Sequence, residues 1–358
     1  MIDLIELESK LKHQIKDEKP FVLYSLQGSS EVKMLLQKDS KQDEIRDFSE
    51  SGFAFVSFDR KKQLLISRSN SEEASFEIDA DSVSNNTSYR KDDAQTSAKA
   101  NFEKIVAKAI AEIENGEFGK VVLSRKETQN IDGSKFFEIY LRVLKTYPNG
   151  YCYCFYHPES GIWIGATPEK LLKVSGNSFT TMALAGTQKI ENSAAELTWE
   201  TKEQEEQAFV TDFILRGIEN AVDDLKISRP YTAQAGTIAH IKTDISGVLK
   251  EVGDVEYLVK VLHPTPAVCG MPKDKATHFI SNNEGYSREF YSGFLGELNM
   301  PNKKGELQTD FYVNLRCMQV EQEQAQIFVG CGITKDSNPE KEYYETVNKS
   351  QTMKKILI

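Results

Sequence analysis

The spacing of hydrophobic and polar positions changes several times along the chain and predicts strands and helices in groups. Apolar residues recur at helical spacing between residues 102 and 113, and Gly116 ends that run. Further helices are expected at 1–18, 134–147, 194–224, 254–262 and 272–282, and from Pro339 onward. Alternating or continuous apolar runs between polar turns predict strands at 20–27, 31–37, 52–58, 62–67, 120–124, 232–249, 290–298, 309–318 and 325–333, and a strand-rich block at 150–190.

Strands that follow one another through hairpin-length turns, with helices between the groups, are typical of an α+β protein. We therefore expect large, mixed and mostly antiparallel sheets rather than a doubly wound parallel sheet. Residues 80–97 are polar and are the best candidate for a boundary or a flexible loop. The chain accordingly divides into a strand-rich part, 1–95, and a larger region, 96–358, and we expect one compact unit.

The composition is that of an ordinary globular protein. The 358 residues are 39% hydrophobic and 27% charged, and no apolar run approaches the length of a membrane span. The net charge of −10 argues against nucleic acid as a partner, but a local basic pocket can still bind a small anionic substrate. The acidic, amphipathic N-terminus does not resemble a signal peptide, so we expect a cytoplasmic protein. A monomer is expected, with a weak dimer as the alternative.

The cysteines and histidines do not suggest disulfides or a structural metal site. Five cysteines include no C-x-x-C pair, and Cys152 and Cys154 alternate with aromatic residues, which favours packing thiols. The five histidines are scattered along the chain, and a structural zinc site is not expected. The candidate chemistry therefore comes from carboxylates, lysines and one arginine.

The segment near the C-terminus combines an apolar strand, two glycines and a charged helix. The run 327–333 is expected to be a strand that closes on a Gly-x-Gly turn, and the helix that begins at Pro339 follows it. Glu342, Glu345 and Lys349 are three and four residues apart and share one face of that helix. This arrangement could form the floor of a site for Mg²⁺ and an anionic substrate. The alternative is a solvated helix with an ordinary Glu–Lys pair.

Two further residues have the surroundings of an acid–base pair. Lys120 opens an apolar strand after Gly116 and Gly119, but the spacing does not fit a phosphate-binding loop. It is either a charge at the edge of a strand or, if buried, an amine with a lowered pKa that serves as a base. Glu169 follows Pro168 at a turn. It is either a turn carboxylate or a partly desolvated general acid.

Three other segments are candidates for binding. Residues 202–210 form a carboxylate cluster in a helix, from which one Glu could turn inward to a metal ion. Residues 263–272 contain three prolines and one glycine, which favours a binding loop over a simple turn. Arg316 lies between apolar strand residues and needs an anionic partner if it is buried. That partner is a substrate carboxylate or one of the many glutamates.

Taken together, these segments resemble the chorismate-utilising enzymes, which include isochorismate synthase, salicylate synthase and the first components of anthranilate and aminodeoxychorismate synthase. The resemblance extends in family order over about residues 100–358, whereas residues 1–95 match only loosely. The matching runs are 120–125, 165–169, 184–187, 202–210, 263–270, 287–293, 315–317 and 330–349. The resemblance implies an α/β sandwich in which residues 1–95 complete the framework of a chorismate-binding catalytic region.

The resemblance also implies roles for individual residues. Lys120 matches the base that activates water, and Glu169 matches the general acid. Glu206 and Glu345 match the Mg²⁺ ligands, with Glu342 in the acidic shell nearby. The residues that match the substrate-binding positions are Ala185, Gly186, Thr187, Ala267, Val268, Leu315, Arg316, Gly330, Gly332 and Lys349. Of these, Arg316, Gly330 and Lys349 match the groups that hold substrate carboxylates.

Three positions favour one activity within the family. Amine-transferring relatives usually have Gln at the position of Lys120, and the aminodeoxychorismate type has Lys at the position of Ala185. The anthranilate-, aminodeoxychorismate- and salicylate-forming relatives usually have Thr or Ser at the position of Ala267, so Ala267 favours stopping at isochorismate without loss of pyruvate. The resemblance therefore implies an isomerase of the hydroxymutase type, an Mg²⁺-dependent isochorismate synthase that serves menaquinone or siderophore biosynthesis. The alternative is a salicylate synthase or an amine-transferring relative. The departures from the family pattern are Gln207, where many relatives have His, and Cys331, where Ala is common.

Overall fold

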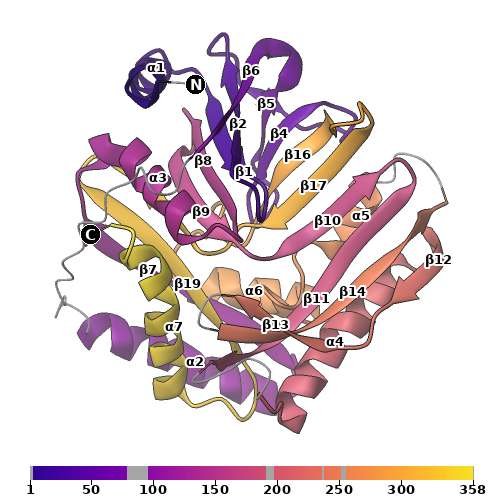
Figure 1. Cartoon of the computed structure of the whole chain (residues 1–358). Coiled ribbons are helices and arrows are strands. Elements are labelled where there is room, and N and C mark those ends of the chain that lie inside the picture. Colours follow the sequence, from indigo (N-terminus) through magenta and orange to yellow (C-terminus); the bar gives the residue numbers. More distant parts are fainter. Residues whose placement is uncertain (1–2, 79–95, 191–196, 236–237, 251–254, 358) are drawn as a thin grey trace.

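The computed structural model describes residues 3–78, 96–190, 197–235, 238–250 and 255–357. The segment 80–97, expected as a boundary or a loop, lies almost entirely outside the described residues. Two large sheets dominate the rest of the chain (Figure 1). Every pair of neighbouring strands in the described part is antiparallel, so the fold expected from the sequence pattern is confirmed.

Strands from both ends of the chain build each sheet. The first sheet contains, in spatial order, β15 (Gly270–Met271), β7 (Lys120–Asn130), β19 (Gln324–Ile333), β18 (Cys317–Val320), β9 (Gly161–Thr167), β8 (Tyr151–His157), β1 (Phe21–Ser25), β2 (Glu31–Gln37) and β6 (Ser71–Glu77). The second contains β12 (Val222–Ile227), β14 (Ile238–Leu249), β11 (Ser178–Lys189), β10 (Lys170–Ser175), β17 (Leu307–Val313), β16 (Phe294–Pro301), β4 (Gly52–Val56), β5 (Gln63–Ser67) and β3 (Asp43–Glu44). A further strand, β13 (Tyr231–Ala235), pairs with β14.

An aromatic layer that takes side chains from both sheets forms the central core. Phe55 of β4 lies 4.3 Å from Phe290, ring centroid to ring centroid, in a nearly parallel stack, and 4.4 Å from Phe155 of β8. Trp163 of β9 stacks on Phe328 of β19 at 5.1 Å. Because these rings come from strands before and after residue 95, the N-terminal strands share one core with the rest of the chain.

Helices cover the outer faces and the lower end of the molecule in Figure 1. The helices are α1 (Leu4–Lys16), α2 (Thr96–Glu114), α3 (Phe136–Thr146), α4 (Thr201–Ile218), α5 (Val255–Leu262), α6 (Lys273–Asn283) and α7 (Pro339–Lys354). Helices α1 and α3 bury their apolar faces on the first sheet, and α4 and α5 bury theirs on the second. Helices α2, α6 and α7 pack around β7 and β19.

The structure corrects several of the expected elements, among them the strand 232–249, which is two strands, β13 and β14, that pair with each other. The predicted helix 194–224 is shorter, since α4 ends at Ile218 and β12 begins at Val222. The predicted strand 309–318 is two strands in different sheets, β17 and β18, with Arg316 in the connection between them. The two glycines of the 327–333 run lie inside β19 and pair with β7, rather than forming a turn. In each case tertiary pairing ended or extended an element that local pattern alone could not delimit.

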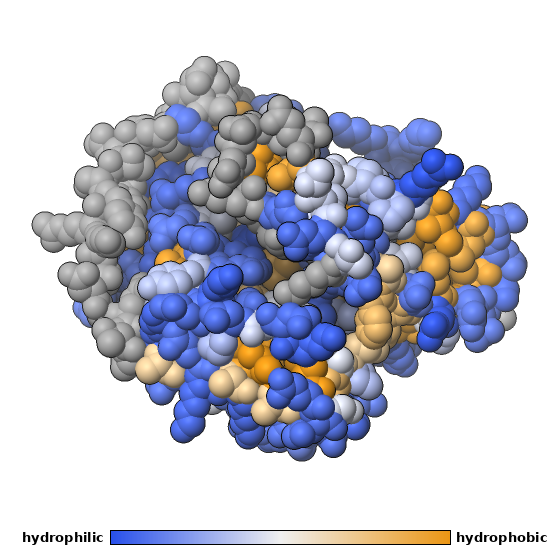
Figure 2. Space-filling view, turned by 90° about the horizontal axis from the view of Figure 1, so that it is seen from below, coloured by the Kyte–Doolittle hydropathy of each residue, from blue (hydrophilic) through white to orange (hydrophobic). Residues whose placement is uncertain are grey.

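The surface is mostly hydrophilic on the face shown in Figure 2, with separate hydrophobic areas. Large apolar side chains that are exposed include Phe209 of α4 and Leu225 and Ile227 of β12. None of the helices within the described residues combines the length and the apolar character needed to span a bilayer.

We predict that Phe55→Ala lowers the free energy of unfolding by about 3–5 kcal/mol, because a buried ring in a packed core leaves a cavity when it is removed. Urea unfolding followed by circular dichroism should show the transition of this variant at a lower urea concentration. Phe209→Ala, at a side chain 49% exposed, serves as the control and should change little.

We also propose that residues 1–95 and 96–358 unfold together. Circular dichroism and fluorescence should then show one shared urea transition, and two separate transitions would contradict the proposal of one unit.

Candidate active site

One cavity brings together residues that are far apart in the sequence. It lies where β7, β11 and β19 meet α4, α7 and the loop before β15. The described residues that line it are Lys120, Val122, Pro168, Glu169, Leu184, Ala185, Gly186, Glu203, Glu206, His240, Ala267, Val268, Tyr291, Ser292, Leu315, Arg316, Phe328, Val329, Gly330, Cys331, Gly332, Thr334, Glu342, Glu345 and Lys349. Every site residue proposed from the sequence is in this set except Thr187, which belongs to β11 but whose side chain lies outside the described part.

Lys120 is the first residue of β7, and its side chain is buried at 7% exposure. Its ammonium forms an ion pair with the carboxylate of Glu206 on α4. Gly332 of β19 lies directly beside this pair. A Cβ atom at Gly332 would lie 3.2 Å from Cε of Lys120 and 3.6 Å from Oε1 of Glu206. The glycine therefore provides the space in which the lysine and the glutamate meet.

Glu169 lies in the short connection between β9 and β10 and is 8% exposed. Burial raises the pKa of its carboxyl group from 4.5 to about 7, although the positive charges of Arg316 and Lys120 act in the opposite direction. Its backbone is fixed, because the amide of Val313 donates a hydrogen bond of 2.9 Å to the carbonyl of Glu169. A carboxyl group with this pKa is partly protonated near neutral pH and can donate a proton.

Arg316 enters the cavity from the connection that crosses from the second sheet to the first. Its backbone has a φ of +48°, and its carbonyl accepts a hydrogen bond of 3.0 Å from the amide of Ala166. Burial lowers the pKa of its guanidinium, yet an arginine remains charged. Within the described residues we find no hydrogen bond or ion pair to this guanidinium. It is therefore available to bind an anionic ligand in the cavity.

The helix α7 carries three of the cavity residues. Pro339 occupies its first turn, and Asn338 caps it by accepting a hydrogen bond from the amide of Lys341 at 3.1 Å. One turn farther on, Glu342 and Glu345 face the cavity. Lys349 forms an ion pair with Glu345 at 2.6 Å and donates a hydrogen bond of 3.1 Å to the carbonyl of Gly330.

A buried network of charges holds α7 against β7. The Arg125 guanidinium of β7 donates to Thr346 Oγ1 of α7 at 2.7 Å and pairs with Glu127 at 3.1 Å. Lys354, in the last turn of α7, pairs with the same Glu127. Arg125 also lies over the ring of Tyr343, 5.0 Å from its centroid. These contacts keep the face of α7 that bears the glutamates at a defined place relative to the strand that begins with Lys120.

A bulge in β11 shapes another wall of the cavity. The register with β14 shifts between Ala185 and Thr187, and Gly186 takes up the extra residue with a φ of +69°. His240 of β14 lies with Nδ1 3.0 Å from the carbonyl of Gly186. Burial lowers the pKa of this imidazole to about 4, so His240 is neutral near pH 7 and Nδ1–H donates to the carbonyl.

The sequence analysis missed several residues of the cavity, among them Glu203, His240 and Tyr291. Glu203 lies one helical turn before Glu206, and its Oε2 is buried without a hydrogen-bond partner in the described part. The sequence did contain a signal for it. Glu203 and Glu206 repeat the spacing of Glu342 and Glu345, so two E-x-x-E pairs on two helices face one cavity. Tyr291 lies in the matching run 287–293 but was given no role there, and His240 has no comparable local signal.

The carboxylates of the cavity fit a Mg²⁺ ion in chemical type. Glu203, Glu206, Glu342 and Glu345 offer hard oxygen donors, and the orphaned Oε2 of Glu203 lacks a cation. Among the described residues, no three His, Cys, Asp or Glu side chains are grouped closely enough to hold a metal by themselves. Mg²⁺ does not require such a cage, since it is usually bound by one or two carboxylates together with water and substrate oxygens. The donor set therefore fits this ion.

Comparisons with known proteins identify the family of the chain. A family model described as chorismate binding enzyme matches residues 53–358. The chain belongs to this family. Its fold matches the structure of MenF, the menaquinone-specific isochorismate synthase from Escherichia coli, with a TM-score of 0.77, 21% identity and coverage of 96% of this chain and 89% of that one. The family recognised from the sequence motifs is thereby confirmed.

Two curated relatives with different activities are about equally similar to this chain in sequence. The salicylate biosynthesis isochorismate synthase of Pseudomonas aeruginosa is 29% identical over 279 residues, which are 76% of this chain and 57% of the relative. Anthranilate synthase component 1 of Lactococcus lactis subsp. lactis is 31% identical over 265 residues, 71% of this chain and 57% of the relative. The chain thus spans little more than half the length of either relative. Identity alone does not separate the two activities, so the cavity residues must.

We predict a pH-dependent effect of Glu169→Gln on stability. The raised pKa means that the folded protein holds the Glu169 proton more tightly than the unfolded chain does, so this stabilisation is present at low pH and is lost as the pH rises from 4.5 through about 7. A glutamine side chain does not titrate, so the variant does not lose stability in this way. Between pH 5 and pH 8 the free energy of unfolding of the variant should rise by up to about 3 kcal/mol relative to that of the wild type.

Urea unfolding at both pH values measures this change in stability difference. Glu205→Gln, which removes an exposed carboxylate from the same protein, is the control. A stability difference between Glu169→Gln and the wild type that stays constant across this range would contradict the raised pKa.

Proposed function

We propose that this protein is an Mg²⁺-dependent isochorismate synthase, an isomerase that adds water at C2 of chorismate and removes the hydroxyl group at C4. The observation that carries the proposal is that Lys120 and Glu169 line the same cavity, one an amine and the other a partly protonated carboxyl group. Such a pair can take a proton at one position of a ring and return one at another. We expect this reaction in the cytoplasm and by a monomer.

The cations of the cavity suit the two carboxylates of chorismate. Arg316 can bind one of them through two parallel hydrogen bonds, and Lys349 adds a second positive charge beside the backbone of Gly330. Ala185, Gly186, Ala267, Val268, Leu315 and Gly332 supply small or apolar walls. We include Thr187 in the substrate site only on the family pattern.

A Mg²⁺ ion, when bound, would supply positive charge to the ring carboxylate and draw electron density from the ring. Glu206 and Glu345 are the proposed ligands, with Glu342 and Glu203 nearby. In the structure Glu206 is paired with Lys120, and Glu345 with Lys349. Both glutamates therefore already neutralise a cation, and each would have to direct a carboxylate oxygen toward the ion as well.

The side chains of this chain then divide the proton transfers between them. Lys120 acts as a base in its neutral form, after its ammonium proton has passed to solvent, and then accepts a proton from the attacking water. Glu169 donates its proton to the departing C4 hydroxyl, which requires the carboxyl form that burial favours. Because water is both added and lost, substrate and product are close in energy, and the reaction should be reversible. The rate should fall as the pH rises past about 7, where Glu169 loses its proton.

The choice of water as nucleophile rests on three side chains of the cavity. Lys120 replaces the Gln of amine-transferring relatives, and Ala185 replaces the Lys of the aminodeoxychorismate type. Ala267 lacks the hydroxyl that pyruvate-releasing relatives usually carry there. All three line the cavity, so each can act on the substrate. A salicylate synthase or an amine-transferring enzyme remains the alternative, and formation of salicylate or anthranilate would release pyruvate.

We predict that the wild-type protein with chorismate and Mg²⁺ forms isochorismate without pyruvate, and that Lys120→Gln lowers this rate by at least about 10²–10⁴-fold, the usual contribution of a general base. Chromatography identifies the product, and a coupled assay detects pyruvate. Lys33→Gln is the matched control, since Lys33 also pairs with a buried glutamate but is outside the described cavity lining. Wild-type turnover by Lys120→Gln would remove this residue from its proposed role.

We predict that Glu345→Ala loses Mg²⁺ binding and activity together, with at least about a 100-fold rise in the Mg²⁺ concentration needed for half-maximal rate. Titration of the rate with Mg²⁺, together with calorimetry, measures both effects. Glu340→Ala is the control, because Glu340 lies in the first turn of the same helix and pairs with Lys99 at the surface. An unchanged titration for Glu345→Ala would place the metal elsewhere.

A further inference from the structure

Strand β7 has an incomplete neighbour on the edge that faces α6. The two-residue strand β15 pairs Gly270 with Val121 and Met271 with Lys120. The amide of Val122 still donates a hydrogen bond of 2.7 Å to the carbonyl of Cys269. Beyond this point no strand of the described part continues the ladder on this edge. The carbonyl of Val122 and the next amide that points the same way, that of Ser124, therefore need other partners.

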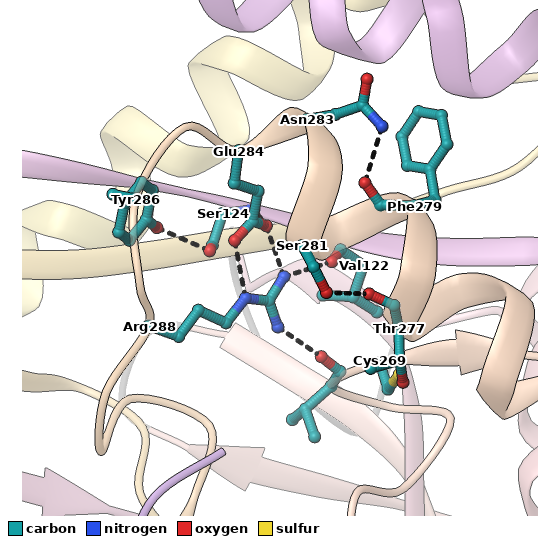
Figure 3. A network of polar contacts seen from close by, with 11 residues as sticks. Val122, Ser124, Cys269, Thr277, Phe279, Ser281, Asn283, Glu284, Tyr286 and Arg288 are labelled. Carbon is teal, nitrogen blue, oxygen red and sulfur yellow. Dashed lines mark hydrogen bonds and ion pairs between the residues drawn. The ribbon is translucent and has the colours of Figure 1, made fainter. Parts of the chain in front are cut away.

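Two side chains take the place of the missing strand (Figure 3). Arg288 donates from Nη2 to the carbonyl of Val122 at 2.6 Å, as a backbone amide would. Glu284 Oε1 accepts a hydrogen bond of 2.6 Å from the amide of Ser124, as a backbone carbonyl would. The guanidinium and the carboxylate also bind each other, with Nε of Arg288 2.8 Å from Oε2 of Glu284.

The same guanidinium reaches the loop that lines the cavity. Arg288 donates from Nη1 to the carbonyl of Val268 at 2.9 Å. One planar group thus bridges the loop before β15 and the strand β7. The bridge is well shielded, because the side chains of Arg288 and Glu284 are 2% and 1% exposed and the guanidinium lies 4.6 Å from the ring centroid of Phe58. Loss of any hydrogen bond from this guanidinium would leave a buried polar atom without a partner, which is costly. The positions of the groups that it joins are therefore well defined.

The atoms held by this bridge belong to the walls of the site. Val122 and Val268 line the cavity, and Lys120 begins the strand two residues before Val122. Ala267, next to Val268, occupies the position that distinguishes the activities of the family. Arg288 and Glu284 themselves are not among the described residues that line the cavity. They can influence the substrate only through the strand and the loop that they join.

We propose that Arg288 and Glu284 are positioning residues, which set the distance and orientation of the Ala267–Val268 wall relative to the Lys120 amine. This inference rests on the proposed isochorismate synthase activity. An arginine is required because a lysine ammonium is a single point and cannot span two carbonyls and a carboxylate in one plane. The carboxylates of the substrate bind to other residues, so the pair should affect turnover more than substrate binding.

The test compares Arg288→Lys and Glu284→Gln with the wild type. We expect kcat to fall by about 10- to 100-fold, as for a displacement of about 1 Å at a reacting centre, with KM changed less than about threefold. The control is Glu297→Gln, which removes a carboxylate that is 3% exposed and pairs with Lys33 outside the described cavity lining. It should lower the melting temperature and leave kcat near that of the wild type.

Hydrogen exchange measured by mass spectrometry supplies a readout that does not depend on turnover. We expect faster exchange in peptides covering 120–124 and 264–270 in both variants, and unchanged exchange there in Glu297→Gln. If both variants lose only stability, as the control does, with kcat and exchange of these peptides unchanged, the positioning role is wrong. If neither variant folds, hydrogen exchange in the wild-type protein provides the test. A segment 264–270 that exchanges far faster than 120–124 would show that the bridge does not hold the two segments together.

The two proposals can fail separately. A wild-type protein that does not convert chorismate would refute the proposed function, while the exchange data would still test whether the bridge fixes the loop. A wild-type protein that makes isochorismate, with variants equal to it in kcat and exchange, would refute only the positioning role.

Discussion

The pairing of β7 with β19 is the constraint on which the site depends. It places Val122 opposite Gly332, so that the lysine at the start of β7 extends beside a residue without a side chain. The space left by that glycine is where the amine of Lys120 meets the carboxylate of Glu206 from α4. The other edge of β7 is held by Arg288 and Glu284, and α7 is held on its face by buried charges. A single strand thus aligns the proposed base, the acidic helices and the loop.

Some charged groups of the cavity have a partner of opposite charge, and others do not. Two lysines are each paired with a glutamate, one between β7 and α4 and one within α7. The remaining charged groups of the described lining include the guanidinium of Arg316 and the carboxylate of Glu203, whose Oε2 atom is buried without a hydrogen-bond partner. Buried charged atoms without partners are costly unless a ligand supplies the opposite charge. This balance is consistent with the proposal that the cavity binds an anionic substrate together with a cation.

Much of this arrangement could be predicted from the sequence, and the failures have physical causes. Most strands and helices followed from apolar spacing, although β6 was not expected and β12 begins in a segment expected to be helical. Ordered motifs identified the family. The break at Arg316 was missed because β17 and β18 are equally apolar, and only pairing with different partners separates them. Glu203 was missed because a helix with many glutamates does not show which of them face inward. Arg288 and Glu284 were missed as a bridge because their backbone partners in β7 are 160 or more residues away.

The N-terminal strands also support the site. Phe55 of β4 stacks on Phe290 at 4.3 Å with an angle of 8° between the rings. The next residue, Tyr291, lines the cavity and stacks on Phe328 of β19 at 5.6 Å. A Cβ atom at Gly330 would lie 3.0 Å from the hydroxyl of Tyr291, so this ring packs closely against the backbone whose carbonyl receives Lys349. Because aromatic rings in a close-packed core transmit displacement instead of absorbing it, the shape of the wall proposed to bind a substrate carboxylate depends on strands that contribute none of the described residues of the cavity lining.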